Sequence, residues 1–452
     1  MKVIVAGAGL SGLVAARALS RERVAVTVLE ARTRAGGRVW TLRGPLEDDQ
    51  HAELGGEFID ADQDEICSLC RELSLPLVRV LRSGFTHRFR GDDGEYHVSR
   101  TRPWTELESV MAPLLRRYRS AHGDPASDAV REIATWSLRQ WLREQGASRE
   151  QHAMADALRG FFLADPDQLS VLPLVAQLAR GGSPAQAEMY RMAGGNDRLV
   201  DALLRESPAR VLLGHRVTAV AQAADRVTLT AIDEHGHQQQ MDADAAVITL
   251  PASALAAVSI TPALPDDQWR AITTLNYGCA TKVIVQLSRP PFRSRARAFA
   301  TDTPLGAFWD GTEGQGRVTS DITAGTSPTG KPGFHVLTFL AGGAASRTLR
   351  ARADRGAHAV LADLCWLGLA DAPVAAFRVV SWEDDPFARG GYAYLDPGFD
   401  PSLVRQLARP AGRLVFAGEH TSEEWQGYMN GAVESGLRAA EEITSRPAII
   451  TS

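Results

Sequence analysis

The first forty residues constrain this chain more than any other stretch. A short apolar run, Val3 to Ala6, is typical of a buried parallel strand. It is followed by three glycines in G-x-G-x-x-G spacing and by a segment rich in alanine, which favours a helix. A second apolar strand, Val24 to Leu29, ends on Glu30, which can accept hydrogen bonds from the hydroxyls of an unphosphorylated ribose. This order of strand, glycine turn, helix, strand and acid predicts a dinucleotide-binding unit.

Each part of the predicted unit has a physical role. Gly7 permits the tight turn, Gly9 lets the backbone approach a pyrophosphate, and Gly12 lets the helix pack closely on the strand. The first N–H groups of the helix, at Leu10 and Ser11, have no partner within the helix. They present the positive end of the helix dipole to the phosphates.

A second motif follows directly after the acid-bearing strand, where residues 32–38 read R-x-R-x-G-G-R. The adjacent glycines let the backbone run close under a diphosphate, and Arg38 offers it a fixed fork of donors. This string resembles the second fingerprint of flavoproteins of the amine oxidase, polyene desaturase and protoporphyrinogen oxidase group, where it helps to hold FAD. The continuation AELGGEFID, Ala52 to Asp60, is similar to the loop that passes beneath the flavin ring in that group.

Composition narrows the class of protein. At 452 residues the chain is too long for one ordinary core, so we expect two domains. A hydrophobic content of 44% and a charged content of 23% are typical of a soluble globular protein, and the net charge of −5 gives no reason to expect a nucleic acid or a polyanionic membrane as partner. The first strand begins at residue two, and no run of about 20 apolar residues exists, so we expect a cytoplasmic protein without a leader or a membrane span.

The cysteines and histidines predict no metal site. No group of His, Cys and Asp has metal-ligand spacing, and four cysteines make no disulfide framework. His51 and His420 lie near predicted cofactor segments, but lone histidines are more often structural. We expect buried free thiols at all four cysteines: Cys67, Cys70, Cys279 and Cys365.

Hydrophobic periodicity predicts the remaining elements only coarsely. We expect helices over residues 61–75, mainly over 104–160, and over 351–369. We expect strands over residues 77–98 (with a hairpin turn at 91–94), 211–220, 227–232, 241–250 and 275–287, and loops around short strands over 301–332.

The last seventy residues carry the most specific resemblance. WEDDPFARGGYAYLDPG, Trp382 to Gly398, and the segment Phe416 to Ile443 look like the flavin amine oxidase family, which includes monoamine and polyamine oxidases. The resemblance covers essentially the whole chain and is weakest between Leu77 and Ala185. It implies an α/β fold, α+β overall, in which a Rossmann-type FAD-binding domain is assembled from three segments around an inserted substrate domain of mixed sheet and helices. The expected FAD domain comprises residues 1–76, 190–270 and 381–452, and the substrate domain comprises residues 77–189 and 271–380.

The resemblance also implies how FAD is held. Gly418 and Glu419 would end a strand at the ribityl–phosphate arm, and the final helix would direct its N-terminal N–H groups at the flavin's N(1)–C(2)=O edge. Gly391 stands where mitochondrial monoamine oxidases carry the cysteine bonded to FAD, so non-covalent FAD is expected. The complete set of expected cofactor-binding residues is Gly7, Gly9, Leu10, Ser11, Gly12, Glu30, Ala31, Arg32, Gly36, Gly37, Arg38, Gly55, Gly56, Glu57, Phe58, Val217, Pro251, Trp382, Gly418, Glu419, Gly427, Tyr428, Met429 and Ala432.

Three residues are expected to serve catalysis. Tyr392 and Tyr428 match the two positions of the family's aromatic cage, whose flat walls orient an amine by cation–π attraction and lower its pKa by desolvation. Lys282 matches the lysine that holds a water near flavin N(5). Only three of the 49 basic residues are lysines, and a lysine in an apolar strand needs polar partners or a wet cleft, which favours a chemical role.

The resemblance implies an FAD-dependent oxidase that takes hydride from the α-carbon of an amine and yields an imine, then a carbonyl compound, and hydrogen peroxide from dioxygen. An L-amino acid oxidase of the same fold is an alternative, although GGEFIDADQDEI offers no arginine clamp for a carboxylate after the flavin loop. A flavin-dependent desaturase or porphyrinogen oxidase and a non-catalytic flavin-binding protein are further alternatives. The W-x-G-Y-M and G-G-Y elements argue against the desaturase or porphyrinogen oxidase, and intact Lys282, Tyr392 and Tyr428 argue against a non-catalytic protein. The physiological amine and the oligomeric state stay open, with a homodimer as one option.

Overall fold

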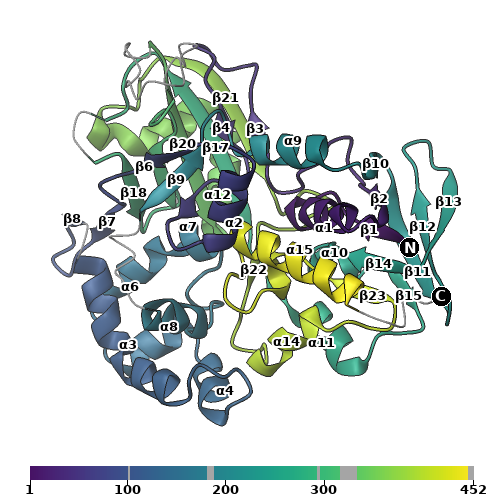
Figure 1. Ribbon diagram of the computed structural model, residues 1–452. Helices are drawn as coiled ribbons and strands as arrows, with labels where there is room; N and C mark the ends of the chain where they lie inside the picture. The colour runs from purple at the N-terminus through teal and green to yellow at the C-terminus, as the bar shows by residue number, and fades with distance from the viewer. Residues whose placement is uncertain (100–101, 181–187, 293–295, 316–332, 446–452) are drawn as a thin grey trace.

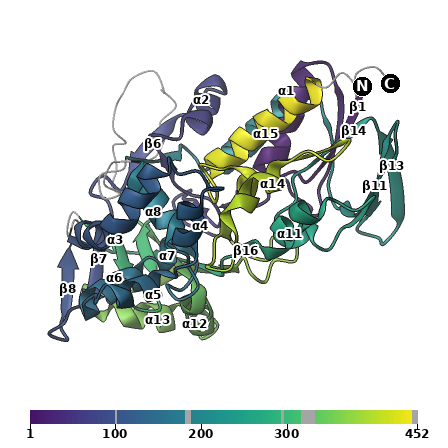
Figure 2. The same cartoon turned by 90° about the horizontal axis from the view of Figure 1, so that it is seen from below.

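Two large sheets organise the chain. The computed structural model describes residues 1–99, 102–180, 188–292, 296–315 and 333–445 (Figure 1). One sheet, with the helices α1 and α15 beside it, lies at one end of the molecule, and the other sheet and a group of helices lie at the other end (Figure 2). Among the described residues, no helix combines the length and the apolar character needed to cross a bilayer.

The first sheet is the predicted dinucleotide-binding unit. Its order is β10-β2-β1-β14-β23, and every neighbouring pair is parallel. Side chains of β1 alternate between two cores, with Val5 in one and Ile4 in the other, because a parallel sheet is buried on both faces. The strands are β1 (Lys2–Ala6), β2 (Ala25–Leu29), β10 (Arg210–Leu212), β14 (Ala245–Ile248) and β23 (Leu414–Phe416).

Two helices from opposite ends of the chain cover this sheet together. Helix α1 (Leu10–Arg21) follows the glycine turn, and α15 (Met429–Thr444) lies beside it in both views (Figures 1 and 2). A Cβ on Gly436 would lie 2.5 Å from the carbonyl oxygen of Ser11, so only glycine lets the two helices approach this closely. The final helix therefore packs on α1 through its small residues. It begins at Met429, three residues before the predicted start at Ala432.

The second sheet is mixed and has seven strands in the order β21-β17-β20-β19-β18-β7-β8. Strand β17, which carries Lys282, pairs antiparallel with β20 on one side and β21 on the other, and all eight of its residues are buried. The strands are β7 (Thr86–Arg90), β8 (Tyr96–Ser99), β17 (Ala280–Leu287), β18 (Ala298–Thr301), β19 (Ala307–Asp310), β20 (His335–Gly342) and β21 (Val374–Ser381).

Short helices fill the region predicted to be helical. Ser137 and Ser148 each begin a helix with a reciprocal capping box, because a glutamine three residues later bonds back to the serine N–H. The helices are α3 (Arg102–Ser120), α4 (Asp128–Ala134), α5 (Leu138–Glu144), α6 (Arg149–Ala157), α7 (Arg159–Phe162) and α8 (Leu172–Ala179).

Small sheets and helices connect these parts. The small sheets are β3-β4 (Thr41–Leu42, Ala52–Glu53), β5-β9-β6 (Ile59–Asp60, Met189–Met192, Leu77–Val80), β13-β12-β11-β15 (Gln238–Ala243, Val227–Ile232, Arg216–Gln222, Ser259–Thr261) and β16-β22 (Asn276–Tyr277, Ala393–Tyr394). The other helices are α2 (Asp64–Glu72), α9 (Asp197–Glu206), α10 (Ala252–Leu255), α11 (Asp266–Thr274), α12 (Gly343–Ala353), α13 (Ala357–Leu361), η2 (Ala362–Leu367), η3 (Pro401–Leu403), α14 (Val404–Ala408) and η4 (Glu419–Thr421).

Several predicted elements differ from the structure. The helix predicted over 351–369 is wrong as one piece, because Gly356 at φ +101° separates α12 from α13 and η2. Glycine and turn residues likewise divide each of the strands predicted over 211–220, 241–250 and 275–287 into two. Cys365 is exposed on η2, and Cys67 and Cys279 are half-buried, so only Cys70 is a buried thiol as predicted. Of the predicted loops over 301–332, residues 316–332, including Lys331, lie outside the described residues.

The strand origins bear on the predicted domain division. The first sheet takes β1 and β2 from residues 1–76, β10 and β14 from 190–270, and β23 from 381–452. The second sheet takes β7 and β8 from 77–189, and its other strands fall within 271–381. Where each connecting segment belongs stays a prediction.

Candidate active site

A single cavity of about 1270 Å³ runs from the glycine turn after β1 to the helical region. Side chains or backbone of every predicted site residue line it, with the exception of Gly12. A Cβ on Gly12 would lie 2.0 Å from the carbonyl oxygen of Gly7, so this glycine serves the contact between helix and turn. The cavity therefore joins residues that the sequence places hundreds of positions apart.

The glycine turn forms a cradle with room for a ligand. Gly7 has φ +108°, a backbone conformation that residues other than glycine rarely adopt. A Cβ on Gly9 would meet no atom within 4 Å, although the residue lines the cavity, so its bare Cα faces open space. No side chain of the described residues caps the start of α1, so the N–H groups of its first turn are available at the same place. This combination fits a diphosphate.

Glu30, which follows β2, is fixed beside the glycine turn by two backbone hydrogen bonds. Glu30 is buried, and its Oε2 accepts the N–H of Ala8 at 2.8 Å while its Oε1 accepts the N–H of Arg32 at 2.9 Å. Each carboxylate oxygen has a second lone pair, which can accept a ribose hydroxyl. The two backbone bonds fix the direction in which these lone pairs point.

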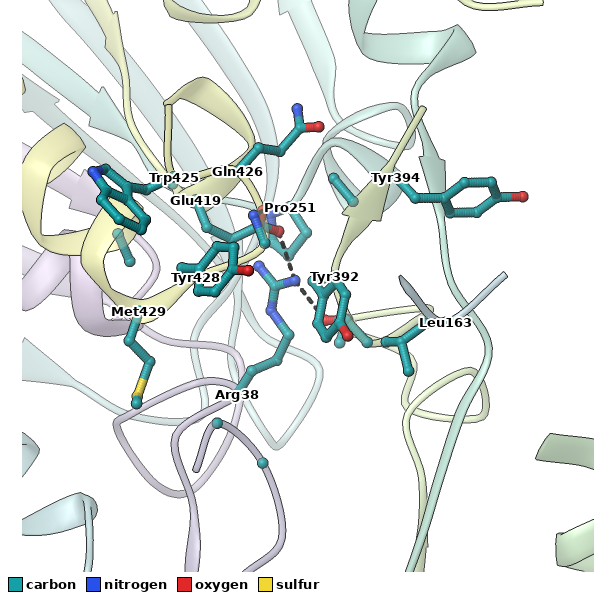
Figure 3. A pocket seen from close by; sticks show the side chains of 18 of the residues that line it. Arg38, Leu163, Pro251, Tyr392, Tyr394, Glu419, Trp425, Gln426, Tyr428 and Met429 are labelled. Carbon is teal, nitrogen blue, oxygen red and sulfur yellow. Dashed lines mark hydrogen bonds and ion pairs between the residues drawn. The ribbon is translucent and has the colours of Figure 1, made fainter. Parts of the chain in front are cut away.

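Arg38 links three segments of the cavity wall (Figure 3). Its Nη1 donates to the Gly391 carbonyl at 2.7 Å and to Glu419 Oε1 at 2.9 Å, and Glu419 Oε2 accepts the N–H of Gly427 at 2.8 Å. Burial lowers the pKa of Arg38, but the Glu419 carboxylate, together with Tyr277 and Asp385, outweighs burial and raises it. The carboxylate of Glu419 thus holds Arg38 and the loop before α15, and the expected contact of Glu419 or its backbone with FAD stays a prediction.

The loop predicted to lie beneath a flavin ring is shaped by close packing. A Cβ on Gly55 would lie 1.8 Å from the Arg38 carbonyl oxygen, so the loop tolerates only glycine there. Trp382 is buried and donates its indole N–H to the Leu54 carbonyl at 2.9 Å. Met429 packs its sulfur over Gly56, where a Cβ would be 3.0 Å away. These contacts fix the course of the loop along the cavity wall.

Lys282 reaches this loop from β17. Its Nζ donates to the carbonyl oxygens of Glu53 and Gly55, each at 2.9 Å, and to Glu57 Oε2 at 2.7 Å. The residue is 3% exposed and lines the cavity. All three ammonium protons therefore have protein acceptors, and a water molecule would have to replace one of them.

The two predicted cage tyrosines lie in one wall region. In Figure 3 the rings of Tyr392 and Tyr428 appear on either side of the Arg38 guanidinium, whereas Tyr394 points away from them. Tyr392 donates its hydroxyl to the Phe161 carbonyl, and the ring of Tyr428 packs edge-on against Trp425 at 5.7 Å between centroids. Burial raises the pKa of both phenols, that of Tyr428 to about 12, so both are neutral donors at physiological pH.

Beyond the loop lies an aromatic cluster that sequence reasoning missed. Phe58, Phe85, Phe161 and Trp309 line the cavity with ring centroids 5.0 to 6.2 Å apart. They come from separate parts of the chain, so no spacing rule connects them. The cluster supplies an apolar chamber next to the predicted cofactor loop.

Other singled-out residues are not part of the cavity wall. His51 and His420 do not line it, and burial lowers the pKa of each imidazole to about 4. None of the four cysteines lines it either. Within the described ranges, no three His, Cys, Asp or Glu side chains are grouped to hold a metal ion.

Curated proteins and solved structures resemble this chain over nearly its whole length. AofH of Mycobacterium tuberculosis, provisionally named a flavin-containing monoamine oxidase, is 29% identical over 98% of this chain and 96% of its own length. Amine oxidase A (flavin-containing) of Bos taurus is 24% identical over 98% of this chain and 84% of its own. The structure of a putrescine oxidase bound to putrescine superposes with a TM-score of 0.81 at 21% identity, covering 99% of this chain and all of the other, which shows a shared fold.

A family model gives the assignment. The model described as flavin containing amine oxidoreductase matches residues 10–444, nearly the whole chain. The glycine cradle, Glu30 and the closely packed loop at Gly55 fit the cofactor of that family. The chain therefore belongs to the family of flavin-containing amine oxidoreductases, and its cofactor is FAD.

Proposed function

We propose that this enzyme oxidises primary or secondary amines with an apolar, ring-containing body, and passes the electrons to dioxygen with release of hydrogen peroxide. The observation that carries the proposal is the aromatic chamber, which opens onto the same cavity as the dinucleotide cradle and the two tyrosines. Bound FAD supplies the acceptor for a hydride from the carbon beside the amine nitrogen. The residues proposed to hold it are those of the cradle, Glu30, Arg38, the loop Gly55–Phe58 and the first turn of α15.

The protein's own residues prepare the amine. The faces of Tyr392 and Tyr428 attract the substrate's ammonium by cation–π interaction. Phe58, Phe85 and Trp309 replace the water around it and so favour the neutral amine, whose nitrogen lone pair assists loss of hydride. Tyr392 is fixed in place by its bond to the Phe161 carbonyl, which keeps the wall rigid. We assign no residue as a strong base.

The charges near the chamber favour monoamines. The carboxylate of Glu57 contacts the chamber directly, because it accepts the indole N–H of Trp309. Lys282 and Arg191 already neutralise Glu57, so it offers no counter-charge to a second ammonium group of a polyamine. A second ammonium left in an aromatic chamber without a counter-charge would be costly.

The same network weighs against an amino acid substrate. The buried Arg191 stacks over Phe58 at 5.3 Å, but it is bonded to Glu57 and to the carbonyls of residues 310, 311 and 313. Arg180, at the end of α8, is exposed and donates to the Glu424 carbonyl. Both terminal nitrogens of Arg191 are thus taken by Glu57 and backbone carbonyls, so this buried arginine offers no pair of donors to a substrate carboxylate inside the chamber.

A screen of peroxide release tests the substrate class. We expect kcat/KM for 2-phenylethylamine or cyclohexylamine to exceed that for putrescine by roughly 10- to 100-fold, since burying one ring contributes about 1.5–3 kcal/mol. L-Phenylalanine, which differs from 2-phenylethylamine by its carboxylate, is expected to be a poor substrate. A preference for putrescine or L-phenylalanine would contradict the proposed class, and no turnover with any amine would contradict the proposed activity.

The substitution Tyr428→Ala tests whether amine oxidation depends on the proposed aromatic cage. It removes one wall of the proposed cage, so we expect kcat/KM to fall by a larger factor than the affinity for FAD. A variant that loses FAD but, when saturated with it, oxidises amines normally would place Tyr428 in the cofactor site alone.

We further propose that FAD is bound without a covalent link. A Cβ on Gly391 would lie 2.4 Å from Leu163 Cδ1 and 2.9 Å from Ala280 Cβ, so this position has no room for a longer side chain. Heating or acid precipitation of the purified enzyme should release all the yellow colour into the supernatant, as absorbance spectra would show. Colour retained by the washed precipitate would contradict this prediction.

A further inference from the structure

A buried charge network lies under the loop Gly55–Phe58. Glu57 Oε2 accepts from Lys282 Nζ at 2.7 Å, and Glu57 Oε1 accepts from the Trp309 indole N–H at 2.7 Å and lies 3.0 Å from Arg191 Nη2. The exposed fractions of these four residues are between 2% and 7%. Two cations thus share one carboxylate in a place largely closed to solvent.

The carboxylate is ionised because of its neighbours. Burial opposes its charge, but Lys282 and Arg191 outweigh burial and hold the pKa of Glu57 below its usual range. With both cations charged, the three side chains carry one net positive charge. Glu53, on the same loop, differs in that its side chain bonds only to Thr41 and to the N–H of Asn196, and burial raises its pKa to about 7.

We propose that Glu57 lowers the reduction potential of bound FAD by acting on Lys282. It is a positioning residue: its charge balances that of Lys282, and its hydrogen bond holds the ammonium against the loop on which the flavin ring is expected to rest. The inference rests on the proposed function only in taking FAD to occupy this cavity. Lys282 has two carbonyls and one carboxylate as acceptors, and only the carboxylate carries a charge. Glu57 is therefore the partner that sets how much positive charge the loop presents to the cavity.

The sign of the effect follows from charge. A reduced flavin is more negative than an oxidised one, so added positive charge nearby favours reduction. Glu57→Gln removes the negative charge, keeps the shape of the side chain, and leaves two net positive charges in the network. The reduction potential of bound FAD should rise.

An equilibrium reductive titration of bound FAD against a reference dye at pH 6 tests this inference without any amine. We expect Glu57→Gln to raise the potential, and Glu57→Gln combined with Lys282→Met, which restores one net positive charge, to return most of the way to the wild-type value. Glu53→Gln is the matched control, because Glu53 is mostly protonated at pH 6 and its substitution removes little charge. Its potential should stay near that of the wild type.

Two results would overturn the inference. One is a wild-type potential in a folded, FAD-loaded Glu57→Gln variant; the other is a double variant, Glu57→Gln with Lys282→Met, whose potential stays as high as that of Glu57→Gln alone. If Glu57→Gln alone does not fold, the charge-restored double variant should recover FAD binding, and failure to do so also refutes the inference. A wild type that oxidises no amine yet shows the expected shifts would refute the proposed substrate and leave the role of Glu57 standing.

Discussion

Gly9→Ala is expected to remove most of the FAD from an otherwise folded enzyme. The backbone of Gly9 has φ −70°, which alanine adopts freely, and its added Cβ would touch no protein atom within 4 Å. The methyl group would instead occupy the space into which the diphosphate must fit. Overpacking of a close contact costs about 1–3 kcal/mol, so the Kd for FAD should rise by roughly 5- to 150-fold. Fluorescence titration of the apoprotein with FAD measures this change.

Gly12→Ala provides the contrast for that experiment. Its Cβ would lie 2.0 Å from the Gly7 carbonyl oxygen, so it should lower the Tm of the apoprotein as well as the affinity for FAD. Gly9→Ala should leave the Tm of the apoprotein near that of the wild type. If Gly9→Ala bound FAD with wild-type affinity, the cradle would not be the diphosphate site.

The dinucleotide unit could be predicted from sequence because its geometry is local. The turn, α1 and Glu30 lie within thirty residues, and each depends on a residue type with one dominant physical property: a glycine that frees the backbone, or an acid at the end of a strand. The structure places Gly7, Gly9 and Glu30 at one end of the cavity, where this pattern puts them. The C-terminal elements were predicted only through resemblance, since nothing local in residues 416–443 indicates what they contact.

The aromatic chamber could not be predicted, because its geometry depends on contacts between distant parts of the chain. Phe85 and Phe161 meet at 5.0 Å because β7 joins β18 in the second sheet while α7 packs against β19 and β20. Aromatic residues in apolar strands and helices look alike in sequence whether they face a core or a cavity. Long-range strand pairing decides this, and a single sequence does not reveal it.

The partners of Lys282 could not be predicted from the sequence either. Its rarity and its place in an apolar strand indicated that it needed a partner, but the partner, Glu57, is 225 positions away. The resemblance supplied a water molecule as that partner, whereas the structure supplies three protein acceptors. A buried ammonium must have a polar partner, but the sequence does not show which group that partner is.

Lys282→Met should therefore slow amine oxidation severely while the enzyme keeps its FAD. Methionine fills nearly the same volume, and Glu57 retains Arg191 and the Trp309 indole, so the carboxylate is not left without partners. What disappears is one buried positive charge held by three fixed acceptors against the cofactor loop. Loss of one preorganised electrostatic group in a closed site typically costs roughly 10²–10³-fold in kcat. Amine-dependent oxygen consumption and the visible spectrum of the variant measure the two quantities separately.

Lys2→Met is the matched control, because Lys2 is an exposed lysine at the start of β1 and does not line the cavity. Its oxygen consumption should equal that of the wild type. Unchanged turnover in Lys282→Met would show that the ammonium only ties the loop to β17, a task its two carbonyl bonds could perform without chemistry. If Lys282→Met lost FAD but turned over normally once reloaded with it, the ammonium would likewise serve only to tie the loop to β17. A residue that only holds the loop changes the affinity for FAD, whereas a charge that assists the reaction changes the rate.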